Sequence, residues 1–283
     1  MSSNNIKLKD FNFKVKPTDD FYEFVNGGWI RNNPVPHDQA KWGTFNVLHD
    51  INQDRLKKIF SSLSRKASLH GYSQKLRDYY LSGVNIEGRN KLGLKEIEPL
   101  LCQVDSIKDI RTFFSRLGQF HQIGASSLWS VSVEQDMKNS SKYIFTISQS
   151  GLGLPDRDYY LRKDSHSKNI RKEYTKYMCK IFSLGGFNDQ EAQKFSQVIL
   201  RIETHLAQIS MNKVDLRDPY LAYNKFTLKD LIKKYPRIYW RDYFANIDVV
   251  PPKHLLVCQP NFFVGLNKLM KNISLNDWRI YLK

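Results

Sequence analysis

The stretch Gly151–Leu161 constrains the fold more than any other part of the sequence. It reads Gly-Leu-Gly-Leu-Pro-Asp-Arg-Asp-Tyr-Tyr-Leu and directly follows two strand-like runs, Leu128–Val133 and Tyr143–Ser148. These runs are rich in β-branched and aromatic residues, and the polar segment Glu134–Lys142 lies between them. The pattern predicts a β-hairpin with its turn at Asn139–Ser141.

The loop after this hairpin has an unusual composition for a plain connection. Its two glycines give the backbone freedom, its proline fixes φ where the chain turns away, and a charged triplet follows. The triplet can form charge-assisted hydrogen bonds that hold the loop in place, so we expect a structural role for it and not catalysis. The expected structural loop comprises Gly151, Gly153, Pro155, Asp156, Arg157 and Asp158.

Most of the remaining chain carries apolar residues at helical spacing. Long amphipathic helices are expected over residues 46–64, 165–184 and 189–211. Near the start, Asp19 and Asp20 suit the beginning of a short helix, and Gly27-Gly28 is expected to end it. The 283 residues suffice for one large domain or two smaller ones. We therefore expect a mainly α fold, built from many helices and one small β-hairpin.

The composition excludes several classes of protein. No apolar run is long enough to span a bilayer, and the polar start lacks the apolar core of a signal peptide. Three widely spaced cysteines, Cys102, Cys179 and Cys258, fit a reducing compartment, so we expect a cytoplasmic protein without a membrane partner. The net charge of +16 could indicate nucleic-acid binding, but the lysines are spread along the chain without a stripe, and we expect no nucleic-acid partner.

Residue patterns for catalysis are absent from the sequence. None of the seven histidines lies in an HExxH motif, and Glu203-Thr-His205 would place its two side chains on different faces of a helix. The Gly151-x-Gly153 pair is followed by a proline where a phosphate-binding helix would need N–H donors. We therefore expect no catalytic residue, no metal ligand and no cofactor in this chain.

Six stretches, in the same order along the chain, resemble the neprilysin/endothelin-converting-enzyme family of zinc metalloendopeptidases. The resemblance is closest to the bacterial oligopeptidase O type, since animal members carry cysteines where this chain has Asn26 and Gly83. The six stretches are Asp19–Trp29, Pro34–Asp50, Leu81–Leu101, Gly151–Leu161, Arg217–Leu231 and Trp278–Leu282.

The resemblance covers only the N-terminal region of that family. It implies a fold of two mostly helical lobes around a chamber that admits peptides, with residues 51–283 forming the lid lobe and residues 1–50 packing on the catalytic lobe. It also implies that zinc, held by an HExxH helix and an ExxxD helix, belongs to the complete enzyme and that its substrate is a peptide. Neither motif occurs in this sequence.

The resemblance further suggests a subsite for the C-terminal carboxylate of a peptide. Family members use arginines near the segment that matches Lys41–His49. Lys41 and His49 occupy those places here, and Asn46 replaces an acidic residue. Lys41 offers a point charge without the bidentate fork of arginine, and His49 contributes only when it is protonated.

Three hypotheses about function remain open. In the first, the chain is a truncated or split zinc endopeptidase, completed by a catalytic half on a separate chain. The helix expected to start at Ser274 and to be cut off at Lys283 favours truncation. In the second, it is a non-catalytic module that binds peptides or proteins, and in the third it is a basic nucleic-acid binder.

Overall fold

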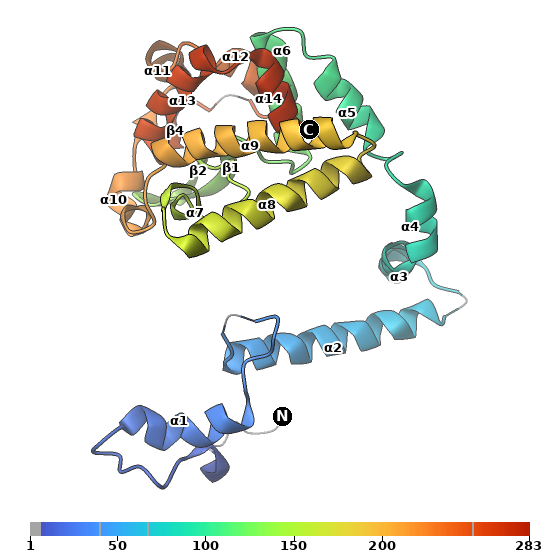
Figure 1. Cartoon of the computed structure of the whole chain (residues 1–283), viewed down its shortest axis with the longest axis vertical. Helices are drawn as coiled ribbons and strands as arrows, with labels where there is room; N and C mark the ends of the chain where they lie inside the picture. The colour runs from blue at the N-terminus through green and yellow to red at the C-terminus, as the bar shows by residue number, and fades with distance from the viewer. Residues whose placement is uncertain (1–6, 40, 67, 251) are drawn as a thin grey trace. The chain divides into compact units, whose positions relative to one another are not determined.

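The computed structural model describes residues 7–39, 41–66, 68–250 and 252–283 (Figure 1). The chain divides into two compact units, one that ends at Lys91 and one that comprises Leu92–Lys283. Helices make up most of the described residues, and four strands accompany them. The expected mainly α fold is therefore confirmed.

The N-terminal unit consists of helices that bury almost nothing. Asp20 caps its first α-helix, because its carboxylate accepts a hydrogen bond from the Glu23 N–H at 2.8 Å. No residue of the second or third helix is buried. The elements are η1 (Leu8–Asp10), α1 (Phe21–Asn32), α2 (Thr44–Ser64), α3 (Gly71–Val84) and α4 (Ile86–Leu92), which reaches the boundary between the units.

Helix α1 does not end at Gly27-Gly28, and that expectation is wrong. Both glycines are buried inside α1, which continues to Asn32. A Cβ on Gly28 would lie 2.4 Å from the backbone oxygen of Lys9, so the glycine permits close contact with the segment before the helix. The pair marks a packing site in the interior of a helix and not a C-cap.

The C-terminal unit contains the hydrophobic core. Three fully buried tryptophans, Trp129, Trp240 and Trp278, anchor it, together with aromatic residues such as Tyr243 and Phe263. Its helices are α5 (Glu98–Asp105), α6 (Ile110–Gln122), α7 (Asp158–Leu161), α8 (Ser165–Leu184), α9 (Asp189–Ile209), α10 (Pro219–Ala222), α11 (Leu228–Lys234), α12 (Trp240–Phe244), α13 (Pro260–Asn272) and α14 (Leu275–Leu282), with η2 (Asp215–Arg217) as a 3-10 turn.

The predicted hairpin exists and forms part of a larger sheet. Strands β1 (Trp129–Asp136) and β2 (Asn139–Gln149) pair antiparallel. The turn lies at Met137-Lys138, so the expectation of a turn at Asn139–Ser141 is wrong, because these residues belong to β2. Strand β4 (Leu255–Val257) pairs parallel to β2, and β3 (Lys225–Phe226) pairs antiparallel to β4, so the order is β1-β2-β4-β3. The two short strands lie far from the hairpin in sequence, and no local pattern could pair them with it.

Helices α8 and α9 run side by side and pack against each other in this unit (Figure 1). Asn188 begins α9 with a capping box, in which its side chain and that of Glu191 each bond the other residue's backbone N–H. In the part of the chain that the structure describes, no helix is both long and apolar enough to cross a membrane.

Candidate functional site

The loop at residues 151–158 leaves the end of β2 in a conformation that favours glycine. Gly151 has φ of +91°, and the Tyr281 hydroxyl donates a hydrogen bond to its carbonyl oxygen at 2.7 Å. A Cβ at this position would lie 2.6 Å from that hydroxyl and 2.8 Å from the backbone nitrogen of Leu128. Gly151 thus lets the loop pack against both the start of the hairpin and the C-terminal helix α14.

The next glycine binds a buried carboxylate on α9. The N–H of Gly153 donates to Oε1 of Glu203 at 3.0 Å, and the Tyr174 hydroxyl donates to the same oxygen at 3.1 Å. The Tyr160 hydroxyl donates to Oε2 of Glu203 at 2.9 Å and accepts from the Leu154 N–H at 2.8 Å. Glu203 therefore joins the loop, α7 and α8 to α9.

Burial dominates the acid–base behaviour of this cluster. Glu203 is 4% exposed, and burial raises the pKa of its carboxyl to about 7, although three hydrogen bonds favour the charged form. All three donors are neutral, so no cation offsets the loss of hydration. The same burial, together with the nearby Glu203, raises the pKa values of Tyr160 and Tyr174 above that of a free phenol.

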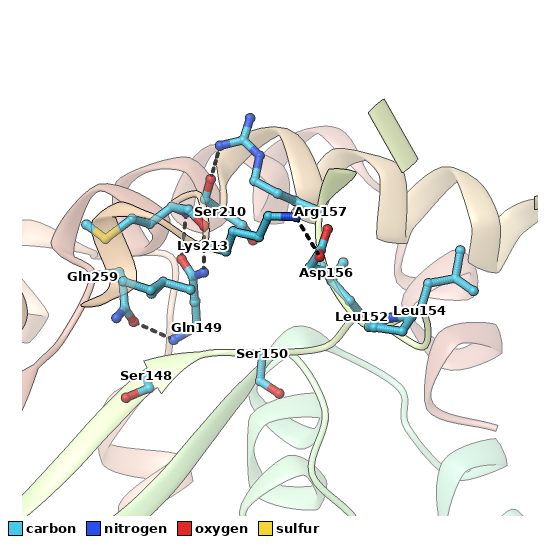
Figure 2. Close-up of a pocket in the computed structure, with 13 residues that line it drawn as sticks. Ser148, Gln149, Ser150, Leu152, Leu154, Asp156, Arg157, Ser210, Lys213 and Gln259 are labelled. Carbon is cyan, nitrogen blue, oxygen red and sulfur yellow. Dashed lines mark hydrogen bonds and ion pairs between the residues drawn. The ribbon is translucent and has the colours of Figure 1, made fainter. Parts of the chain in front are cut away.

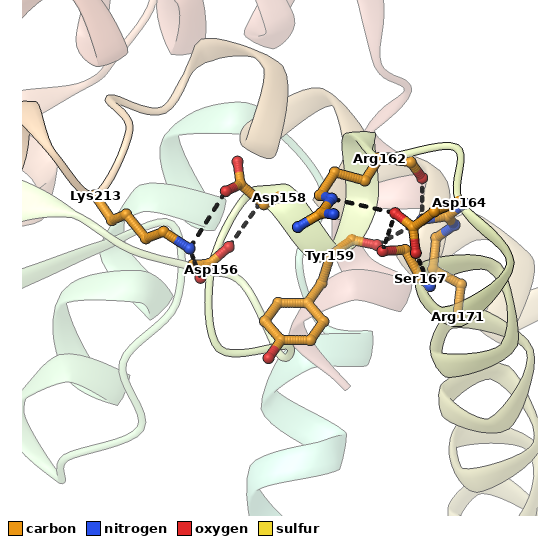
Figure 3. Close-up of polar contacts among 8 residues, drawn as sticks. All are labelled: Asp156, Asp158, Tyr159, Arg162, Asp164, Ser167, Arg171 and Lys213. Atoms are coloured by element: carbon orange, nitrogen blue, oxygen red, sulfur yellow. Dashed lines mark hydrogen bonds and ion pairs between the residues drawn. The ribbon is translucent and has the colours of Figure 1, made fainter.

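The charged triplet at the end of the loop, Asp156-Arg157-Asp158, makes contacts at the surface. Figure 3 shows those of the two aspartates, and Figure 2 shows that of Arg157. The Arg157 guanidinium donates to the Ser210 carbonyl oxygen at the end of α9, and the Asp158 N–H donates to Asp156 Oδ1 at 2.8 Å. The Lys213 ammonium lies 3.7 Å from an oxygen of Asp156 and 3.5 Å from one of Asp158. These contacts tie the loop to the segment after α9.

A hollow of about 430 Å³ lies beside the loop (Figure 2). The side-chain amide of Gln149 bonds both backbone groups of Met211, and Gln259 accepts from the Gln149 N–H at 2.9 Å. These bonds hold one wall rigidly, and Asp156 and Lys213 also line the hollow. The arrangement stabilises the loop and contains no nucleophile paired with a base.

The second predicted site lies at the start of α2, in the N-terminal unit. Lys41, Asn46 and His49 line one hollow of about 400 Å³ together with Trp42 and Phe45. Gly43 precedes the helix and provides no side-chain cap, so the first N–H groups of a 21-residue helix are left for another acceptor. A helix N-terminus beside a lysine favours an anion.

Zinc does not fit the described residues. No group of three or more His, Cys, Asp or Glu side chains in that part of the chain could hold a metal ion. His121 is buried, and its ring nitrogens contact the Tyr243 hydroxyl at 2.7 Å and the Ser127 carbonyl oxygen at 2.9 Å. Burial lowers the pKa of His121, and its contacts give it a place in the core.

The sequence did not reveal the partners of the loop. Spacing along the chain relates Glu203 only to His205, although a carboxylate beside the apolar face of α9 indicates a buried contact. Tyr281 and Ser210 lie far from the loop in sequence, and only the folded chain brings them to it.

The sequence pattern of the N-terminal domain of peptidase family M13 matches residues 17–283. The chain belongs to this family. It is 29% identical to neprilysin-3 of Drosophila melanogaster over 97% of this chain and 38% of that protein. It is 33% identical to endothelin-converting enzyme 1 of Homo sapiens over 94% of this chain and 36% of that protein.

Solved structures show the same relation. The zinc metalloprotease Zmp1 of Mycobacterium tuberculosis, in complex with an inhibitor, matches 98% of this chain and 42% of that chain, with a TM-score of 0.89 and 26% identity. PepO from Lactobacillus rhamnosis HN001 shares the fold, with a TM-score of 0.75 and 17% identity. The chain thus spans about two fifths of the length of these relatives.

Proposed function

We propose that this chain is the lid-forming N-terminal region of a neprilysin-like zinc metalloendopeptidase that degrades peptides. The observation that carries the proposal is the likeness to Zmp1, a zinc metalloprotease, which extends over 98% of this chain at a TM-score of 0.89. The family match over residues 17–283 supports it.

The catalytic residues and the zinc ligands of that enzyme would come from sequence outside these 283 residues, either on the same polypeptide or on a separate chain. The lack of an HExxH motif supports this proposal. The 283-residue chain should therefore hydrolyse no peptide alone. The test is cleavage of a quenched fluorescent peptide with added zinc, with Zmp1 as the positive control, and chelator-sensitive turnover by this chain would contradict the proposal.

Residues 1–50 would pack on the catalytic lobe, and residues 51–283 would form the lid. Support comes from the apolar side chains that the N-terminal unit leaves uncovered, such as Phe21 at 68% and Phe45 at 89% exposure. A hollow of about 720 Å³ in the same unit is lined by Trp29 and Trp42. The test is hydrogen exchange of this chain with and without the co-expressed catalytic region of a relative. If that region does not slow exchange in residues 1–50, this assignment is wrong.

The hollow at the start of α2 would hold the C-terminal carboxylate of a peptide through Lys41, Asn46 and His49. A labelled peptide with a free carboxylate should bind more tightly than its amidated form, and K41A should remove the difference. K57A, on an exposed part of the same helix, is the matched control. Equal binding of both peptides would exclude the subsite.

The alternative is a non-catalytic module that binds peptides or proteins through the same exposed face of the N-terminal unit. It is favoured if the purified chain is a stable monomer that binds peptides without a catalytic partner. We also propose a cytoplasmic location, and the three free cysteines of the described structure support it. Thiol titration of the denatured, unreduced protein should count three free thiols, and a disulfide would argue against that location.

A further inference from the structure

Helix α8 carries a row of lysines at helical spacing. Lys168, Lys172, Lys176 and Lys180 follow one another at four-residue intervals, and all four side chains are exposed. Residues four apart lie on neighbouring positions of one helix face, so these ammonium groups form a line that turns slowly around the helix. The expectation that the lysines form no stripe is therefore wrong for α8.

This row borders a groove between α8 and α9. The groove has a volume of about 570 Å³, and Lys172 and Lys176 line it from the α8 side. From α9, Gln193 and Gln197 line it, one turn apart. Thr175 also lines it, and its hydroxyl donates to the Arg171 carbonyl oxygen at 2.8 Å. Asp189 is the single acidic residue in the lining.

The positive charge of this row is nearly uncompensated. Among the described residues, Lys168, Lys172 and Lys180 form no ion pair, and Lys176 contacts Glu173 at 2.8 Å. Both partners of that pair are more than half exposed, so water screens it and the ammonium remains available to another anion.

We propose that the groove between α8 and α9 binds an extended peptide segment with carboxylates at alternate positions. The lysines advance by about 6 Å per step along α8, because a helix rises about 1.5 Å per residue. Side chains at alternate positions of an extended chain are about 6.6 Å apart on one face, which matches this spacing. The amides of Gln193 and Gln197 can bond the peptide backbone on the other side.

The lining favours an acidic peptide over a single-stranded nucleic acid. Proteins that hold single strands combine positive charge with aromatic side chains on which the bases stack. No aromatic residue is among those that line this groove. The site lies within the Leu92–Lys283 unit and requires no catalytic lobe, so it stands independently of the proposed peptidase activity.

The test uses the full chain and fluorescence anisotropy at low salt. The probe is a labelled ten-residue peptide with glutamate at every second position, and its matched peptide has glutamine there. The glutamate peptide should bind, and the double variant K172E/K176E should weaken binding about tenfold. K229E/K233E changes the net charge by the same amount at the same spacing on α11, and it should bind as the unchanged chain does.

Three outcomes would overturn the assignment. The first is equal binding of the glutamate and glutamine peptides, and the second is equal weakening by the two double variants. The third is tighter binding of labelled oligothymidylate than of the peptide, with the same loss in K172E/K176E. Because all four substituted lysines are exposed, circular dichroism should show unchanged folding, and the salt dependence of the unchanged chain provides a measure that needs no variant.

Discussion

Replacing Glu203 by glutamine should change how the stability of this protein depends on pH. Glu203 is 4% exposed, and burial raises the pKa of its carboxyl from 4.5 to about 7. A glutamine has nearly the same shape and cannot ionise. The variant therefore isolates the free energy that the folded protein loses when this carboxyl gives up its proton.

The sign of the effect follows from the direction of the pKa shift. The folded state holds the proton of Glu203 more tightly than the unfolded state does, so the contribution of this group to stability is fully present below pH 4.5 and is lost as the pH rises to about 7. A shift from 4.5 to about 7 corresponds to about 3 kcal/mol. The free energy of unfolding of the unchanged chain should thus drop by about 3 kcal/mol relative to E203Q between pH 4.5 and pH 8.

The assay is urea unfolding of both proteins at the two pH values, followed by near-ultraviolet circular dichroism of the buried tryptophans. Any difference in hydrogen bonding between a carboxylic acid and an amide affects both pH values and cancels in the comparison. E96Q, at an exposed glutamate before α5, is the control and should follow the unchanged chain. A difference between E203Q and the unchanged chain that is the same at both pH values would refute the reasoning.

Three further predictions concern the two units separately. In chemical unfolding, G151A should destabilise the protein by roughly 2 kcal/mol more than G186A. Both glycines have positive φ, but an added Cβ has open space only at Gly186. W278A should cost roughly 3–5 kcal/mol, since the ring is fully buried in the core beside Phe113, and an unchanged midpoint would mean that α14 does not support the core. Limited chymotrypsin digestion should first cut within Asp19–Trp29, where Phe21 and Tyr22 are 68% exposed, and mass spectrometry that finds the first cut within Leu92–Lys283 would contradict this.

The sequence predicted those features that depend on neighbours along the chain. The apolar spacing identified the long helices α2, α8 and α9 within two residues at each end. The β-branched runs identified the hairpin. Its first strand ends later than expected, at Asp136, and its second strand begins earlier, at Asn139, so the turn is shorter. Local pattern suffices there, because helix faces and hairpins are built from residues close in sequence.

Features that depend on distant partners were not predictable in this way. The Gly27-Gly28 pair reads as a helix end, and only the approach of Lys9 explains why two glycines lie inside α1. The pairing of strand β4 with β2 sets Phe145 opposite Leu255, and no pattern near either residue indicates it. At the candidate loop, the glycines were identified, but Glu203 and Tyr281 could not be assigned to them from spacing.

The two units differ in what holds them together, and this difference bears on the proposed function. The Leu92–Lys283 unit has a core of tryptophans and other aromatic side chains, so burial can stabilise it without help. Helices α2 and α3 contact each other, with the rings of Phe60 and Tyr80 stacked at 5.2 Å, but they bury no residue in the described structure. Helices that bury so little are marginal in water. Exposed apolar residues on such helices, including Phe45 and Tyr79, are typical of a surface that another protein surface covers. The N-terminal unit should therefore gain stability when another protein surface covers these side chains, and for residues 7–50 this is the behaviour that we propose toward a catalytic lobe.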